Sequence, residues 1–312
     1  MGRTRELSRA GLFGVALCAL VVSCGKKADR TAPAATSASA SASFKPAAPV
    51  ASGLPRAPEL VSKVVNPENL PAYSGPTGAV SGVVSATGDL PPVATAYLAK
   101  IKGACPEARE AYGHTFREGM MRSLADVLVA VTGYSGYVPE KEPRRVVAAR
   151  GCAYDTRTID LTFGQTIDLV SKDNQGYVPN LLGAHMQAQI LALPGGAPST
   201  LYPPEPGHYA LTDDLKVFML ADVFVLKYST HDVTGLDGHY EIKGIPVGKA
   251  RISAFLPSTQ GLVERDIEIK AGQTLDLPLQ IAFDAKAYAA ATAGAASGAP
   301  APSAAPAPKP KH

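Results

Sequence analysis

Short runs that alternate apolar and polar residues, separated by glycine or proline, fill the middle of this chain. The clearest runs lie at residues 78–85, 156–161, 166–170, 239–242, 249–256, 262–269 and 274–281. Alternation with a period of two places the apolar side chains on one face of a β-strand, and glycine and proline supply the turns. Strands that recur about every 8–12 residues predict an all-β fold. We expect a Greek-key β-sandwich.

Several segments leave more than one interpretation open. Residues 97–101 fit a strand, whereas 106–112 have a helical composition with Pro106 at the first turn. The nearly continuous apolar run at 216–228 predicts a strand buried on both faces, or a bent strand at the centre of the sandwich. Further strands are expected at 124–131, 186–193 and 208–211, with a polar loop at 171–179.

Both ends of the chain are rich in alanine, serine and proline and poor in branched apolar side chains. Such segments bury too little surface to offset a backbone ordering cost of about 1–2 kcal/mol per residue. We therefore predict a disordered tether over residues 24–74 and a disordered tail over 285–312. The core at 75–284 is then one sandwich or two subdomains, about 75–205 and 206–284.

The N-terminus predicts export. A basic segment containing Arg3, Arg5 and Arg9 precedes an apolar stretch, 11–22, that is shorter than the roughly 20 residues of a spanning helix. It ends in Val-Val-Ser-Cys at Cys24, which resembles the bacterial lipobox. The resemblance implies a lipoprotein signal peptide at 1–23 and acyl chains on Cys24 that anchor the chain to a membrane of the cell envelope. The alternative is an ordinary secretory signal followed by a chance cysteine.

Gly25 follows the predicted lipidation site, so an acidic inner-membrane retention signal is absent at that position. We therefore expect the outer membrane.

Two of the four cysteines remain in the core, because Cys18 leaves with the signal peptide and Cys24 carries lipid. In an oxidising compartment an even pair favours a disulfide between Cys105 and Cys152. Its closed loop of about 47 residues would contribute roughly 3–4 kcal/mol. The alternative is a pair of buried free thiols. A cysteine-based metal site is disfavoured, because neither residue has a cysteine or histidine at ligand spacing.

Residues 233–248 read V-T-G-L-D-G-H-Y-E-I-K-G-I-P-V-G. This segment resembles the T-x-x-D-G-x-F-x-I-x-x-[VL]-P-x-G stretch of carboxypeptidase regulatory-like domains, which are transthyretin-like sandwiches. The run V-S-G-V-V at 80–84 is similar to their first strand. Upstream, 164–174 and Pro206-Gly207 resemble the cupredoxin-like proteins known as methylamine-utilisation-like. The resemblance implies a cupredoxin-like sandwich with a regulatory-like C-terminal meander.

The copper ligands of that family do not match. Its C-x-x-H-x-x-M stretch falls on D-D-L-K-V-F-M, so Asp213 stands in place of cysteine, Lys216 in place of histidine, and Met219 is retained. The upstream histidine falls near Tyr177 or Val178. Blue-copper sites need a thiolate and imidazoles, and a protonated lysine offers no lone pair. The resemblance therefore implies a degenerate metal site, and we expect no cofactor.

Other chemistry has little support. The histidines available for an unconventional copper or zinc site are His114, His185, His208, His231 and His239. We expect instead that His239 is exposed on a hairpin and that Asp237-Gly238 forms a turn. The common motifs of hydrolases, nucleotide-binding proteins and metalloproteases are absent from the sequence, so we expect no enzyme.

A net charge of +3 without a basic stripe argues against nucleic acid. Tyrosines outnumber phenylalanines, twelve to eight, and five lie in or near predicted loops: Tyr134, Tyr137, Tyr177, Tyr202 and Tyr209. They suit contacts with a protein or glycan, or they cap the sandwich ends. We therefore expect a non-catalytic envelope lipoprotein that acts in binding or structure. The alternatives are a periplasmic copper carrier or electron-transfer protein, and a hydrolase on a β scaffold.

Overall fold

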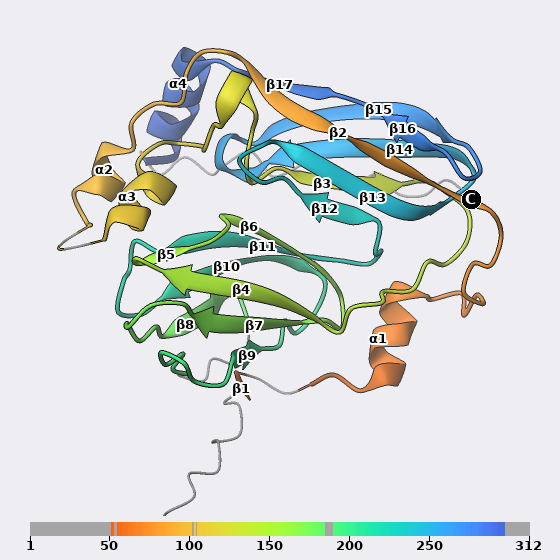
Figure 1. The fold of residues 1–312 in the computed structure, drawn as a ribbon, viewed down its shortest axis with the longest axis horizontal. Coiled ribbons are helices and arrows are strands. Elements are labelled where there is room, and N and C mark those ends of the chain that lie inside the picture. The colour runs from red at the N-terminus through yellow and green to blue at the C-terminus, as the bar shows by residue number, and fades with distance from the viewer. Residues whose placement is uncertain (1–50, 53–54, 102, 104, 185–189, 297–312) are drawn as a thin grey trace, which may run out of the picture. The chain divides into compact units, whose positions relative to one another are not determined.

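The computed structural model describes residues 51–52, 55–101, 103, 105–184 and 190–296 (Figure 1). The predicted signal peptide, Cys24, His185 and the tail beyond residue 296 lie outside these residues. Within the described part of the chain, no helix is both long and apolar enough to cross a membrane.

The strands form two β-sandwiches, which we call lobe 1 and lobe 2 (Figure 1). Lobe 1 pairs a five-stranded sheet, in the order β1-β9-β7-β4-β5, with a four-stranded sheet, β6-β11-β10-β8. Its strands are β1 (Ala51–Ser52), β4 (Arg144–Arg150), β5 (Ala153–Tyr154), β6 (Thr158–Thr162), β7 (Thr166–Ser171), β8 (Pro179–Leu182), β9 (Ser199–Leu201), β10 (Gly207–Asp213) and β11 (Leu220–Leu226). One hydrophobic cluster fills the space between these two sheets.

Lobe 2 contains the sheets β12-β3-β14-β15 and β13-β2-β16, and β17 also pairs with β2. Its strands are β2 (Thr77–Gly88), β3 (Leu128–Thr132), β12 (His231–Val233), β13 (His239–Pro246), β14 (Gly248–Leu256), β15 (Gly261–Ile269), β16 (Thr274–Asp276) and β17 (Leu279–Phe283). A second hydrophobic cluster joins these two sheets. The all-β sandwich class is therefore confirmed.

The strands alternate between the lobes: β1 belongs to lobe 1, β2 and β3 to lobe 2, β4 to β11 to lobe 1, and β12 to β17 to lobe 2. The last two crossings are the connections 133–143 after β3 and 227–230 before β12. A division near residue 205 does not coincide with either sandwich, because β10 and β11 share a sheet with β6 and β8. The reason is non-local pairing: β11 pairs with β6 in parallel, whereas β16 and β17 pair with β2 in parallel.

Burial along the strands follows the predicted period of two. In β2 the residues Val80, Val84 and Ala86 are buried and their neighbours are not. The expectation of a strand buried on both faces at 216–228 is wrong, because β11 covers only 220–226 and its burial alternates. Phe224 on its outer face instead contacts Phe255 of lobe 2, with ring centroids 5.9 Å apart.

Two helices lie within segments for which disorder was expected, α1 (Pro58–Val65) and α4 (Ala285–Ala296). The valines of α1 pack against the core of lobe 1. Asp284 accepts hydrogen bonds from the backbone N–H groups of Lys286 and Ala287, both at 2.9 Å, and so caps α4. Alanine buries little surface, but it is also the best helix former, so the composition that suggests disorder permits a capped helix.

Helices also resolve the ambiguous stretch before residue 122. It contains α2 (Thr95–Leu98), α3 (Pro106–Tyr112) and the 3-10 turn η1 (Met120–Arg122), and a second turn, η2 (Pro257–Thr259), follows β14. The predicted disulfide is confirmed and joins Cys105, before α3, to Cys152, after β4. The strand expected at 186–193 is not seen over its described residues, 190–193. A strand, β8, forms instead at the end of the predicted polar loop.

Candidate functional site

The four predicted positions lie in one region of lobe 1: Tyr177 in the loop after β7, Asp213 at the end of β10, and Lys216 and Met219 in the loop that follows β10. We call them the Lys216 cluster. The Lys216 ammonium Nζ lies 4.2 Å from the centroid of the Tyr177 ring and donates a 2.9 Å hydrogen bond to the Gly176 carbonyl. The Met219 N–H donates to the Lys216 carbonyl at 2.7 Å, and the Met219 side chain is fully buried.

Backbone groups satisfy the carboxylate of this cluster. Asp213 Oδ2 accepts from the Val178 N–H at 2.7 Å, and Oδ1 accepts from the N–H groups of Leu215 and Lys216 at 3.0 and 2.7 Å. Both oxygens are therefore engaged in holding the two loops together.

A second carboxylate supports the tyrosine. The Tyr177 hydroxyl donates to Asp173 Oδ2 at 2.8 Å and accepts from the Cys152 N–H at 3.3 Å. Burial raises the pKa of Tyr177, and its hydrogen bond to Asp173 raises it further. Burial alone would raise the pKa of Asp173, but the hydrogen bonds from Tyr177, Gly151 and Gln175 lower it. The ring thus stays neutral beneath the lysine ammonium.

These donors do not fit copper. A lysine that donates to a carbonyl and lies over an aromatic face is an ammonium, and an ammonium has no lone pair for a metal. Asp213 already accepts three N–H bonds, which leaves the Met219 thioether as the soft donor of the four. Among the described residues, no group of three or more His, Cys, Asp or Glu side chains is placed to hold a metal.

A second polar cluster lies between the lobes, along strand β6. Ile159 and Leu161 point into the core of lobe 1, whereas Thr158, Asp160 and Thr162 alternate with them and so lie on the opposite face. All three polar residues are at most 5% exposed. We call them the polar face of β6. Apart from Arg145 of β4, the partners of these three side chains are residues of, or adjoining, lobe 2, so this face joins the two sandwiches.

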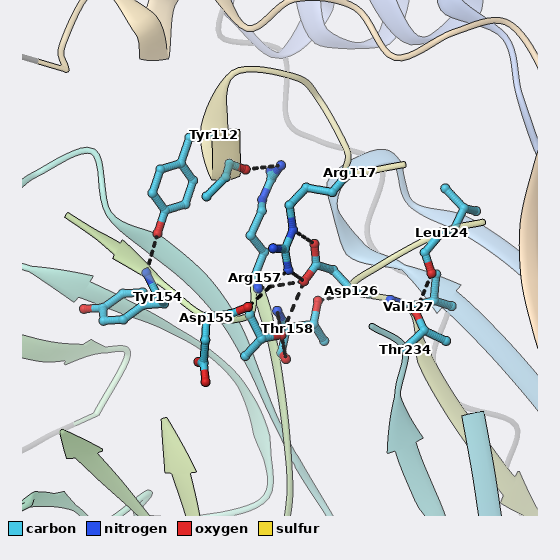
Figure 2. A network of polar contacts seen from close by, with 12 residues as sticks. Tyr112, Arg117, Leu124, Asp126, Val127, Tyr154, Asp155, Arg157, Thr158 and Thr234 are labelled. Atoms are coloured by element: carbon cyan, nitrogen blue, oxygen red, sulfur yellow. Dashed lines mark hydrogen bonds and ion pairs between the residues drawn. The ribbon is translucent and has the colours of Figure 1, made fainter. Parts of the chain in front are cut away.

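Figure 2 shows the contacts at the Thr158 end of the polar face. The Thr158 hydroxyl donates to the Asp126 carbonyl at 2.8 Å, just before β3. The Asp126 carboxylate accepts from Arg117 Nε at 2.7 Å and from the Arg157 N–H at 2.8 Å (Figure 2). Although burial disfavours a charged Arg117, the hydrogen bond and charge of Asp126 raise its pKa. This buried ion pair therefore stays charged.

The other end of the polar face carries a histidine. Asp160 Oδ2 lies 2.8 Å from His231 Nδ1, and His231 Nε2 lies 3.0 Å from the Thr162 hydroxyl. The Thr162 hydroxyl is also 2.7 Å from Glu140 Oε2. Arg145 Nη2 lies 3.3 Å from Asp160 Oδ1, an ion pair without hydrogen-bond geometry. Burial alone would raise the pKa of Asp160, but the hydrogen bond and charge of His231, with Arg145, lower it.

Sequence reasoning named His231 only as one of five histidines and did not single out Asp160 or Thr162. The signal was present in T-I-D-L-T at 158–162, where polar residues occupy every second position of a strand. What the alternation cannot show is that the polar side of this strand is buried against a second sandwich.

The other predicted positions are scattered over the molecule. His114 and His239 are exposed, the latter as expected, and the Asp237–Gly238 turn is present, with Gly238 at a φ of 71°. His208 pairs with Asp222 at 2.8 Å. Of the five loop tyrosines, Tyr177 and Tyr209 are buried, which favours a capping role for those two, and Tyr134, Tyr137 and Tyr202 are partly exposed.

The fold and these clusters define an all-β protein of two sandwiches. No family model matches the chain, and no curated protein matches it. Among solved structures it is similar to amicyanin from Paracoccus versutus, with a TM-score of 0.24 and 18% identity over 31% of this chain and 97% of that one. It is also similar to the copper-containing nitrite reductase from Thermus scotoductus, with a TM-score of 0.24 and 13% identity over 30% of this chain and 25% of that one. The likeness to cupredoxin-like folds is weak and covers less than a third of the chain.

Proposed function

We propose that this chain is a non-catalytic envelope lipoprotein whose β-sandwiches bind a protein or glycan partner, and that the Lys216 cluster replaces a metal with an ammonium. The observation that carries the replacement of a metal is the Lys216 ammonium, which lies 4.2 Å from the Tyr177 centroid and donates to the Gly176 carbonyl. A cation built into the protein gives the loops their order without a bound ion.

The lipobox resemblance at Cys24 supports the membrane anchor, and the glycine at position 25 is consistent with an outer-membrane location. Helix α1, which lies within the predicted tether, packs on lobe 1 through Val61, Val64 and Val65. This part of the tether is therefore held on the folded domain. The partly exposed Tyr134, Tyr137 and Tyr202 offer amphipathic rings for a partner.

Metal binding tests the proposal directly. Purified wild-type chain should contain no stoichiometric copper and should gain no visible absorption when titrated with Cu(II). The triple variant Tyr177→His, Asp213→Cys and Lys216→His supplies imidazoles and a thiolate beside Met219, and it should gain a strong visible band. Stoichiometric copper in the wild type would favour the copper carrier and overturn the proposal.

Lipidation is tested separately. Cells supplied with labelled palmitate should label the wild-type chain and leave Cys24→Ala unlabelled, while Cys18→Ala serves as a matched control that keeps its label. Fractionation should place the labelled protein in the outer membrane. A wild-type chain that is cleaved but carries no lipid would support the ordinary secretory signal.

A hydrolase is the second candidate, because Asp160, His231 and Thr162 stand in the order carboxylate, imidazole, hydroxyl. A nucleophilic site needs its hydroxyl open to substrate with its proton directed to the imidazole. Thr162 is only 4% exposed, and its hydroxyl is also bonded to Glu140, so we favour the non-catalytic function. Esterase and glycosidase screens of wild type and Thr162→Val distinguish the two. Activity lost in the variant would establish the hydrolase.

A further inference from the structure

Beyond the proposed function, we propose that His231 is a doubly protonated imidazolium that fastens lobe 2 to lobe 1, and that loss of one proton releases the 133–143 connection. This makes the junction of the lobes a pH-dependent latch. Two of the chain crossings meet here: His231 follows the 227–230 connection, and Glu140 belongs to 133–143.

The first step is the proton of Thr162. Glu140 Oε1 accepts hydrogen bonds from the N–H groups of Lys141 and Glu142 at 2.8 and 3.0 Å, an arrangement that favours the ionised carboxylate. The Thr162 hydroxyl lies 2.7 Å from Glu140 Oε2 and 3.3 Å from the Tyr228 carbonyl oxygen. Both are acceptors, and the 2.7 Å contact to the Glu140 carboxylate is shorter than the 3.0 Å contact to His231 Nε2, so we assign the single hydroxyl proton of Thr162 to Glu140.

The second step is the ring of His231. Because the Thr162 proton is directed elsewhere, His231 Nε2 at 3.0 Å can bond to that hydroxyl only as a donor. His231 Nδ1 lies 2.8 Å from Asp160 Oδ2, and an ionised Asp160 is also only an acceptor. Both ring nitrogens therefore carry a proton.

The surrounding charges suit a cation here. The groups that face it are Asp160 on β6, Glu140 on the connection, Arg145 on β4, and Asp232, the next residue of β12. The side chains of His231 and Asp160 are 7% and 5% exposed, so solvent screens their attraction little. Asp232 is satisfied by the N–H groups of Val233 and Glu241. Arg145 adds positive charge, but its side chain is 44% exposed and therefore well screened.

Deprotonation forces a rearrangement. When Nε2 loses its proton it becomes an acceptor facing the Thr162 oxygen, so the hydroxyl must turn its proton from Glu140 to His231. Glu140 Oε2 then loses its hydrogen-bond donor and faces a lone pair of the Thr162 oxygen, which destabilises the position of the Glu140 side chain. Glu140 also lines a cavity of about 460 Å³ beneath α1, together with Val61 and Val65. The latch is closed with the proton bound, so rising pH opens it.

Nuclear magnetic resonance of the full chain with ¹⁵N-labelled histidine tests the proposal. The His231 nitrogens should both report protonation at acidic pH, and the titration of His231 should move the amide signals of Lys141 and Glu142 with the same midpoint. In Glu140→Gln the new amide can donate to Thr162, so a neutral His231 is accommodated. Its midpoint should fall by about one pH unit, a tenfold change in proton affinity.

The matched control is Glu142→Gln, which changes the same charge on the same connection without touching Thr162. It should leave the His231 midpoint in place. A His231 ring that is neutral at a pH of about 5, where an ordinary imidazole is charged, would overturn the proposal. Equal midpoints in both glutamine variants would also overturn it.

Discussion

The Lys216 cluster and the polar face of β6 both bury charge, but they satisfy it differently. In the Lys216 cluster, the ammonium and Asp213 bond to backbone groups of adjacent loops within one lobe. On the polar face, Asp160 and Thr162 bond to side chains that come from outside lobe 1. Backbone partners are fixed by the fold, whereas side-chain partners depend on the protonation state of both sides. The Lys216 cluster is therefore held in one arrangement by the fold, whereas the polar face of β6 forms a junction that responds to pH.

The largest effect should come from breaking the buried ion pair at the Thr158 end of the junction. In Asp126→Asn the side chain keeps its shape and tolerates the positive φ of 65°, but Arg117 loses its counter-charge. Both side chains are at most 16% exposed, so the free energy of unfolding should fall by about 3–5 kcal/mol, measured by urea denaturation.

The control for that variant is Asp266→Asn, which removes the partner of Arg251 in an ion pair exposed by 51% and 79%. Solvent already screens this pair, so no measurable change is expected. If the two variants were equally stable, the junction would not depend on paired charge and the comparison would fail.

The dependence of stability on acidic pH should also distinguish the two clusters. The pKa of Asp160 and that of Asp173 are both lower than usual, so each carboxylate stabilises the fold above its unfolded pKa of about 3.9. That contribution is lost as the pH falls through the lower, folded pKa. Asp160→Asn should therefore flatten the acid limb of stability against pH more than Asp173→Asn does, because Asp160 is more deeply buried. The same series of urea titrations at decreasing pH measures both, and the reverse order would contradict it.

The features that the sequence predicts are those determined by residues close together in the chain. The strands β2, β13 and β14 were foreseeable, because alternation and glycine turns act within a few residues. The pairing of β11 with β6, and of β17 with β2, joins segments that lie far apart in the chain, and no local pattern specifies it. The alternation of the chain between the two lobes therefore could not be predicted.

The candidate sites follow the same rule. The Lys216 cluster could be predicted, because Asp213, Lys216 and Met219 are close in sequence and a family resemblance pointed to Tyr177. The latch could not, because Glu140, Asp160 and His231 come from three segments that meet only when both lobes are folded. The polar positions 158, 160 and 162 gave a pattern, but an exposed strand has the same one.

The smallest effect on stability should come from Lys216→Met, which tests whether the Lys216 cluster needs its charge. Methionine keeps an unbranched apolar chain against the Tyr177 ring but loses the bond to the Gly176 carbonyl and the attraction of the ammonium to the ring. Because Asp213 is already satisfied by three N–H groups, no buried carboxylate is left without a partner. Stability should fall by only about 1–2 kcal/mol in urea denaturation. A loss of stability as large as that of Asp126→Asn would show that both clusters depend on side-chain charge. The distinction between the Lys216 cluster and the polar face of β6 would then have to be abandoned.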